Sequence, residues 1–129
     1  MNGERRYFLD TNALIALGNG HDGLRQMLEA AEYIATSVIC KIEYLQGVVD
    51  NPMAYAAFVS LLNMIDVVDL THGDIMLTNE VLNIRQTNKH IKLPDAIVMA
   101  SAISRQAVLI TNDRQLLNAG FVESQGYEC

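Results

Sequence analysis

Short apolar runs alternate with amphipathic segments along the chain. The runs have the length and the β-branched or aromatic content of buried strands, and they lie at 6–9, 33–36, 64–70 and 107–110. A shorter run at 120–123 predicts a last edge strand. Apolar residues recur at helical spacing at 13–17, 24–31, 38–49, 53–63, 75–84 and 96–105, and a short helix is expected to end at 117. This alternation predicts a three-layer α/β/α sandwich around a mainly parallel sheet of four to five strands.

Capping and turn residues predict where several helices begin. Asp10 follows the first strand and Asp113 follows the fourth, and each is suited to cap the helix after it. Thr71 and Asp74 have the spacing of a capping box, which predicts Thr71 as the N-cap of the helix at 75–84. The helix at 38–49 is expected to bury one apolar face, formed by Val38, Ile42, Leu45 and Val49.

The composition is that of a globular domain. Half of the 129 residues are hydrophobic and 19% are charged, no run approaches the roughly 20 apolar residues that span a bilayer, and residues 1–129 are expected to form a single domain. The net charge of -6 argues, at first, against a nucleic-acid partner. The first apolar run is too short for a secretory leader, so we expect a cytoplasmic protein without a membrane partner. The six methionines are expected to fill the core.

Four acidic residues occupy positions from which they could share one site. Asp10 and Asp113 follow strands at the carboxyl edge of the predicted sheet, where ligands bind. Asp95 lies in the first turn of a helix, and Glu43 lies in the second turn of another. Each acid also has a structural explanation, as a cap, a dipole partner or an exposed helix residue. Together, however, four carboxylates would repel one another unless cations held them, which favours a site for a hard divalent ion such as Mg²⁺.

Four segments, in this order and at these spacings, resemble the PIN-domain nucleases, and in particular the short single-domain VapC toxins. They are Phe8-Leu9-Asp10-Thr11-Asn12, Ser37 with Glu43 and Gly47, Leu93-Pro94-Asp95-Ala96-Ile97 with the alanines after it, and Leu109-Ile110-Thr111-Asn112-Asp113. The resemblance implies a PIN-like fold related to the 5′-nuclease core. It also implies hydrolysis of RNA phosphodiester bonds with Mg²⁺ or Mn²⁺, a small antitoxin protein as a possible partner, and a homodimer.

The resemblance assigns a role to each matching residue. Thr111 would lie near the metal or the attacking water, with Thr11 and Asn12 in support. Many toxins of this branch carry an acid five residues after that threonine, where this chain has Leu116. The residue two positions after the threonine must then supply the fourth acid. The implied metal-binding and catalytic acids are therefore Asp10, Glu43, Asp95 and Asp113.

Two other functions compete with this interpretation. One is a PIN-like domain that has lost catalysis and only binds. The other is a receiver-like signalling domain with a Mg²⁺ pocket, which is a weaker match because Asp10 stands alone and no lysine follows Asp113. The glycines at 18, 20 and 23 have the letters of a dinucleotide-binding motif, but no strand leads directly into them, and a flexible loop explains them better.

The basic residues and histidines give weaker signals. The three histidines, at 21, 72 and 90, share no metal-ligand spacing and are expected on the surface. An acidic chain would bind RNA mainly through divalent cations held by its carboxylates. Basic residues close in sequence to the motifs could follow an RNA backbone, namely Arg5, Arg6, Lys41, Lys89, Lys92 and Arg114.

Overall fold

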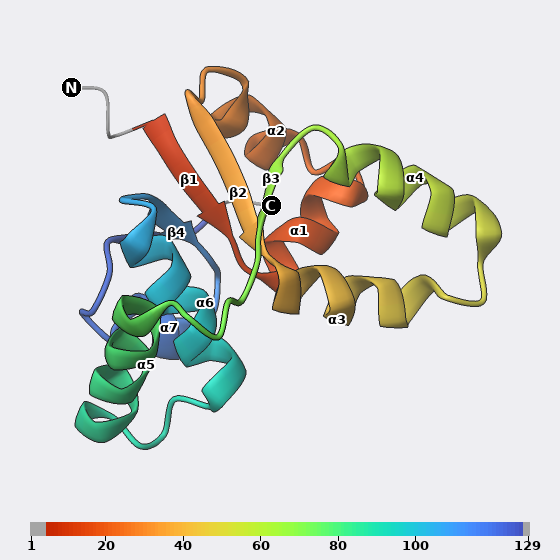
Figure 1. Ribbon diagram of the computed structural model, residues 1–129. Helices are drawn as coiled ribbons and strands as arrows, with labels where there is room; N and C mark the ends of the chain where they lie inside the picture. Colours follow the sequence, from red (N-terminus) through yellow and green to blue (C-terminus); the bar gives the residue numbers. More distant parts are fainter. Residues whose placement is uncertain (1–4, 128–129) are drawn as a thin grey trace.

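Five parallel strands form a sheet with helices on both faces, in a computed structural model that describes residues 5–127 (Figure 1). Helices α1, α2 and α4 lie on one side of the sheet, and α5 and α6 lie on the other (Figure 1). The predicted α/β/α sandwich is confirmed. In chain order the elements are β1 (Arg6–Leu9), α1 (Thr11–Gly18), α2 (Asp22–Glu29), β2 (Tyr33–Ser37), α3 (Val38–Val48), α4 (Pro52–Leu62), β3 (Asp66–Val68), α5 (Ile75–Thr87), α6 (Leu93–Ser104), β4 (Val108–Ile110), α7 (Arg114–Leu117) and β5 (Ser124–Gln125).

The strand order places a reversal of the chain at the centre of the sheet. The order is β3-β2-β1-β4-β5, and every neighbouring pair is parallel. The chain moves outward from β1 to β3 and then returns to place β4 on the other side of β1. Leu9 pairs with Ile110, so Asp10 and Thr111 leave the sheet next to each other. Ligand crevices of open parallel sheets form beyond the carboxyl ends of strands at such a switch point.

Small side chains let helix α6 pack closely on the sheet. Ala96, Ala100 and Ala102 of α6 are buried, as is every residue of β4. Because α6 leads into β4 and runs opposite to the strands, its first turn lies at the carboxyl edge of the sheet. The alanine-rich sequence of α6 thus brings Asp95 toward the strand ends that carry Asp10 and Thr111.

Two predictions about chain turns are wrong. The last strand forms at Ser124–Gln125 instead of 120–123, because Gly120 has a φ of 81° and the chain bends before it pairs with β4. The N-cap of α5 is Asp74, whose carboxylate accepts a hydrogen bond from the Leu77 N–H at 2.9 Å. Thr71 instead forms a turn before the helix, where its carbonyl accepts a hydrogen bond from the Asp74 N–H.

Helix α3 buries a different face from the one that the sequence predicts. Cys40 and Tyr44 are buried, whereas Ile42 is 56% and Val49 is 63% exposed. The reason is the contact with α1, where the absence of a side chain on Gly18 makes room for the Tyr44 ring. Ile42 and Val49 are therefore left on the outer surface of α3, while Val38 and Leu45 of the predicted face are half-buried.

Most methionines are not core residues. Met53, Met64 and Met76 are 85%, 79% and 82% exposed, and only Met99 is fully buried among the described ones. Exposed methionines are soft apolar groups that suit adaptable protein contacts. No helix within residues 5–127 combines the length and the apolar character needed to cross a membrane.

The contact between α1 and α3 predicts a stability effect at Gly18. A Cβ atom on Gly18 would lie 2.5 Å from the Tyr44 hydroxyl oxygen. The Tyr44 ring cannot turn away freely, because it is buried and stacks on Phe58. Gly18→Ala is therefore expected to lower the free energy of unfolding by about 1–3 kcal/mol, measured by urea denaturation.

A matched control exists on the neighbouring helix. A Cβ atom on Gly47, inside α3, meets nothing within 4 Å, so Gly47→Ala should be neutral or stabilising by up to about 1 kcal/mol. Combining Gly18→Ala with Tyr44→Phe, which removes the clashing hydroxyl, should recover part of the loss. If Gly18→Ala is as stable as the wild type, the close contact does not exist in solution.

Candidate metal site

A polar cavity of about 410 Å³ opens at the carboxyl edge of the sheet. All four acids expected from the sequence line it, from the β1–α1 junction, α3, α6 and the β4–α7 junction. The fold therefore brings together carboxylates that are far apart in the chain. The full lining is Asp10, Thr11, Asn12, Glu43, Gln46, Asp95, Val98, Asp113 and Leu116.

Two of the acids are helix caps as well as cavity residues. Asp10 Oδ1 accepts a hydrogen bond from the Ala13 N–H at 2.8 Å and caps α1. Asp113 Oδ1 caps α7 by accepting from the N–H groups of Gln115 and Leu116, at 2.8 and 3.3 Å. Each cap uses one carboxylate oxygen and fixes the side chain in place. The cap itself leaves the second oxygen of each carboxylate unused, so a capping role does not exclude a role in binding a ligand.

Burial and neighbouring charges act on Asp10. The residue is only 8% exposed, and this loss of solvation raises the pKa of its carboxyl above 3.8. Hydrogen bonds from the Thr111 hydroxyl and the Ala13 N–H oppose the rise, while the charges of Asp113 and Glu43 add to it. Thr111 is fully buried, and its hydroxyl oxygen also accepts a hydrogen bond from the Asp113 N–H at 3.0 Å. Thr111 therefore connects the two acids that follow β1 and β4.

Asp95 has fewer contacts. Partial burial is the main cause that raises the pKa of its carboxyl, followed by the charges of Asp113, Glu43 and Asp10. The positive charge of Lys92, just before α6, opposes this rise and lowers the pKa of Asp95. Within residues 5–127, no hydrogen bond reaches the Asp95 carboxylate. Its position in the first turn of α6 places it at the positive end of the helix dipole.

Glu43 is held toward the other acids by helix α1. The Thr11 hydroxyl donates a short hydrogen bond to Glu43 Oε1, and both residues line the cavity. Glu43 is otherwise exposed on α3, so Thr11 is the contact that orients its carboxylate. The supporting role expected for Thr11 has this hydrogen bond as its physical basis.

The donor set fits a hard divalent cation. It consists of four carboxylates and nearby hydroxyls, which are the oxygen ligands that Mg²⁺ and Mn²⁺ prefer. The mutual repulsion that raises the pKa values of Asp10 and Asp95 is the interaction that a bound cation would relieve. In the part of the chain that the structure describes, no three acidic, histidine or cysteine side chains converge into a ready coordination sphere.

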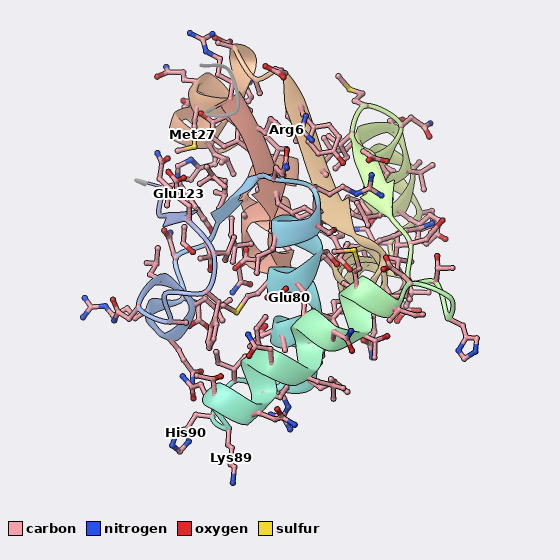
Figure 2. All side chains as sticks on the ribbon, turned by 60° about the vertical axis from the view of Figure 1, so that its left-hand side comes forward. Arg6, Met27, Glu80, Lys89, His90 and Glu123 are labelled. Atoms are coloured by element: carbon pink, nitrogen blue, oxygen red, sulfur yellow. The ribbon has the colours of Figure 1, made fainter. Side chains whose placement is uncertain are left out.

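The basic residues expected to follow an RNA backbone lie in different parts of the molecule, and Lys41 is half-buried on α3. The Arg5 and Arg6 guanidinium groups bind the carbonyls of Ala30 and Arg105, at the start of β1 and therefore at the opposite edge of the sheet from the acids. Lys89 points away from the body of the molecule beyond the end of α5 (Figure 2). Lys92 and Arg114 directly precede or follow cavity segments, and no basic residue is part of the cavity lining itself.

Three lining residues are missing from the sequence prediction. Gln46 lies three residues after Glu43 on α3, a spacing that places both on one helix face and could have revealed it. Val98 and Leu116 supply the apolar part of the cavity wall and are almost fully buried. Leu116 occupies the position, five residues after Thr111, where the resemblance described above leads one to expect an acid. In this chain that position lines the cavity with a hydrophobic side chain.

The sequence matches a known family over most of its length. A family model described as the PIN domain covers residues 7–122. The chain belongs to the PIN-domain family. The match includes every segment that lines the cavity, and it removes the receiver-like alternative. No curated protein sequence matches the chain.

Solved structures share the fold of this PIN domain over nearly its whole length. The VapBC2 complex from Rickettsia felis, bound to a DNA fragment from its promoter, has a TM-score of 0.81 at 21% identity, covering 95% of this chain and 98% of that chain. A toxin–antitoxin complex from Klebsiella pneumoniae has a TM-score of 0.74 at 28% identity, covering 90% and 94%. VapC20 from Mycobacterium tuberculosis, a toxin that cleaves the sarcin–ricin loop, has a TM-score of 0.69 at 19% identity, covering 91% and 97%. These likenesses confirm the PIN-like fold expected from the sequence.

Proposed function

We propose that this PIN domain is a divalent-metal-dependent ribonuclease and the toxin of a toxin–antitoxin pair. The observation that carries the proposal is the meeting of Asp10, Glu43, Asp95 and Asp113 in one cavity at the topological switch point. A structural role for each acid would not require the four segments to converge. The PIN family match and the toxins among the structural relatives support the same conclusion.

The four carboxylates would hold one or two cations between them. A bound Mg²⁺ or Mn²⁺ would lower the pKa of an attacking water, neutralise charge on the phosphate oxygens and stabilise the leaving oxygen. Asp10 and Asp113 each offer the carboxylate oxygen that their helix caps leave free. Thr11 orients Glu43, and Thr111 fixes the relative position of Asp10 and Asp113.

Asp95 is the best candidate to accept a proton from the attacking water. Its carboxylate is not held by a hydrogen bond from the described residues, and its partial burial and acidic neighbours favour the protonated form. A group of this kind can take up a proton at the site and release it afterwards. Cleavage of the phosphodiester would then require only water as co-reactant.

The same arrangement explains how an acidic chain could act on a polyanion. The cavity lining contains no basic residue, so a phosphate would be attracted by the cations that the carboxylates bind. Lys92 lies three residues before Asp95 and Arg114 directly follows Asp113, so both would assist at the rim of the cavity.

The direct test is a cleavage assay on labelled single-stranded RNA. The purified chain should cleave the RNA when Mg²⁺ or Mn²⁺ is present and stop when EDTA is added, and activity should return on replenishment. Absence of cleavage with either cation would instead favour a PIN-like domain that only binds.

We propose that an antitoxin binds an apolar hollow of about 290 Å³ beside α1, α2 and α4. Leu17, Leu28, Leu61 and the exposed Met64 line this hollow, which suits an apolar segment of a protein partner. The hollow lies outside the acidic cavity, and the two share no lining residue. The toxin–antitoxin complex from Klebsiella pneumoniae among the structural relatives supports such a partner.

We propose that a second copy of the chain covers a hollow of about 270 Å³ between α5 and α6. No aspartate, glutamate, lysine or arginine lines this hollow, and the charged residues of α5, Glu80 and Arg85, are half-buried outside it. Each chain carries a net charge of -6, so two copies repel each other in general. The repulsion is smallest where they meet through a surface that lacks charged side chains. Exposed apolar side chains line this hollow, namely Leu82 and Leu93, each 52% exposed, and such side chains of one copy could pack against the same hollow of the other across a two-fold axis.

Leu82→Glu is expected to convert the dimer to a monomer. Leu82 is 52% exposed and lines the α5/α6 hollow, so the substitution would place like charges against each other across a two-fold axis. Light scattering coupled to gel filtration measures the mass directly. Val59→Glu on α4, outside this hollow, is the control and should leave the dimer intact. A monomeric wild type, or a dimeric Leu82→Glu variant, would contradict this interface.

A further inference from the structure

A segment near the C-terminus packs against the loop that carries Thr111 and Asp113. We call residues 123–127 the C-terminal tail. Its backbone binds β4 and the loop after it, with the Thr111 N–H donating to the Gln125 carbonyl at 3.0 Å. The Tyr127 N–H then donates to the Asn112 side-chain oxygen at 2.9 Å. The tail passes so close to Asn112 that a Cβ atom on Gly126 would lie 3.0 Å from that oxygen.

The C-terminal tail is in turn attached to the α1–α2 loop and to α2. The rings of His21 and Tyr127 meet edge to face, with centroids 5.4 Å apart and an interplanar angle of 89°. The Gln125 amide lies 3.9 Å from the sulfur of Met27 on α2. Figure 2 shows Met27 on the same side of the molecule as Glu123, the first residue of the tail.

His21 is fixed in this contact by its own helix. Its Nδ1 accepts a hydrogen bond from the Leu24 N–H at 3.0 Å and caps α2, so the proton of the neutral ring belongs on Nε2. Nε2 is buried and has no hydrogen-bond partner among the described residues. The expectation of a surface histidine is therefore wrong at position 21, although His72 and His90 are exposed. The cap sets the ring orientation, and the ring sets the position of Tyr127.

We propose that His21 and Tyr127 are positioning residues for the metal site, acting through Asn112 on the loop of Thr111 and Asp113. This inference rests on the proposed function. Asp113 supplies one of the four acids, and Thr111 links it to Asp10. After Thr111, the loop places no side chain in the core of the sheet. The C-terminal tail supports the outer side of the loop through the hydrogen bond from the Tyr127 N–H to Asn112. Loss of a group that hydrogen-bonds directly to a metal ligand weakens metal binding about 10- to 100-fold, so the effect of these more distant contacts is expected at the lower end of that range.

The test uses variants that separate the ring contact from the helix cap. His21→Asn keeps a side-chain oxygen that can cap α2 but removes the contact with Tyr127. Tyr127→Ala removes the same contact and keeps the backbone N–H that binds Asn112, whereas Tyr127→Phe keeps the ring. Tyr55→Ala, an exposed tyrosine on α4, is the matched control. Mn²⁺ affinity of the full chain and hydrogen exchange of the Asp113 N–H are the two readouts.

The expected result is about tenfold weaker Mn²⁺ binding and faster exchange of the Asp113 N–H in both His21→Asn and Tyr127→Ala. The double variant should lose less than the sum of the two single losses, because both changes remove the contact between His21 and Tyr127. Tyr55→Ala should bind Mn²⁺ like the wild type, and Tyr127→Phe, which keeps the ring contact, should bind it more tightly than Tyr127→Ala. Additive losses, or unchanged exchange at Asp113, would overturn the positioning role. Wild-type affinity in both variants would overturn this inference alone, and a wild type that binds no Mn²⁺ would overturn the proposed function as well.

Discussion

Asp95→Asn is expected to reduce metal-dependent RNA cleavage by at least about a hundredfold while the fold persists. The variant keeps the shape of the side chain but removes a charged ligand from the cavity and the best candidate for proton acceptance. Folding should not suffer, because the Asp95 carboxylate accepts no hydrogen bond within residues 5–127 and is repelled by Asp113, Glu43 and Asp10. The measurement is the rate of cleavage of a labelled RNA at saturating Mg²⁺.

Asp50→Asn is the matched control for this experiment. Asp50 is an exposed acid in the turn between α3 and α4, and it does not line the cavity. It changes the net charge of the chain by the same amount as Asp95→Asn, so it separates a general charge effect from the loss of a metal ligand. Full cleavage by Asp95→Asn, with a melting temperature like that of the wild type, would show that the acidic cavity is not the catalytic site.

The position of the acids was predictable because it follows from chain topology. Parallel strands joined by helices must present the residues after Leu9 and Ile110 at the same edge. The small residues of α6 predict close packing, and this packing brings in Asp95. The cap positions of Asp10 and Asp113 could also be read from the sequence, since a short polar residue between a strand and a helix has few other conformations.

Contacts between distant elements were not predictable in the same way. The apolar pattern of α3 indicates an aliphatic stripe, but the choice of buried face depends on Gly18 of α1, a residue in another helix. Likewise, nothing near His21 in the sequence indicates its contact with Tyr127. A single sequence defines local periodicity well, whereas the choice between two possible packing faces is made by tertiary contacts.

The net charge acquires a narrower meaning once the cavity is known. A charge of -6 first argues against a nucleic-acid partner, but four of the acids lie in one cavity, where cations would offset their charge. No aspartate or glutamate lines the hollow between α5 and α6, so the acidic character is unevenly distributed. The net charge is therefore a poor guide to the class of partner. It predicts instead that any binding of RNA would depend on divalent cations.

Asp10→Asn is expected to make the metal-free protein more stable than the wild type at neutral pH and to abolish the stabilisation by Mn²⁺. The amide oxygen of asparagine can accept the Ala13 N–H that Asp10 accepts now, so the α1 cap survives. What disappears is a buried negative charge close to Asp113 and Glu43. In the wild type, Mn²⁺ at a hundred times its dissociation constant should add about 2.7 kcal/mol to the free energy of unfolding.

The pH dependence gives this prediction its sign. Burial raises the pKa of Asp10 above 3.8, so the folded state favours the protonated carboxyl. The stabilisation from this group is complete below pH 3.8 and is lost as the pH rises through the folded-state pKa. The asparagine variant has no such loss. In EDTA, its advantage over the wild type should therefore be small near pH 4 and grow toward neutral pH, as measured by urea denaturation at several pH values.

The opposite trend would place Asp10 in a different environment. If the metal-free wild type gains stability over Asp10→Asn as the pH rises, the ionised carboxylate is stabilised by the fold, and the crowded acidic cavity does not exist in solution. The Asp50→Asn variant, which changes an exposed acid, should show no comparable pH trend against the wild type. Mn²⁺ should stabilise the wild type and Asp50→Asn but not Asp10→Asn. The same three proteins therefore also test whether the cation binds in the acidic cavity, whose crowded charges destabilise the metal-free chain.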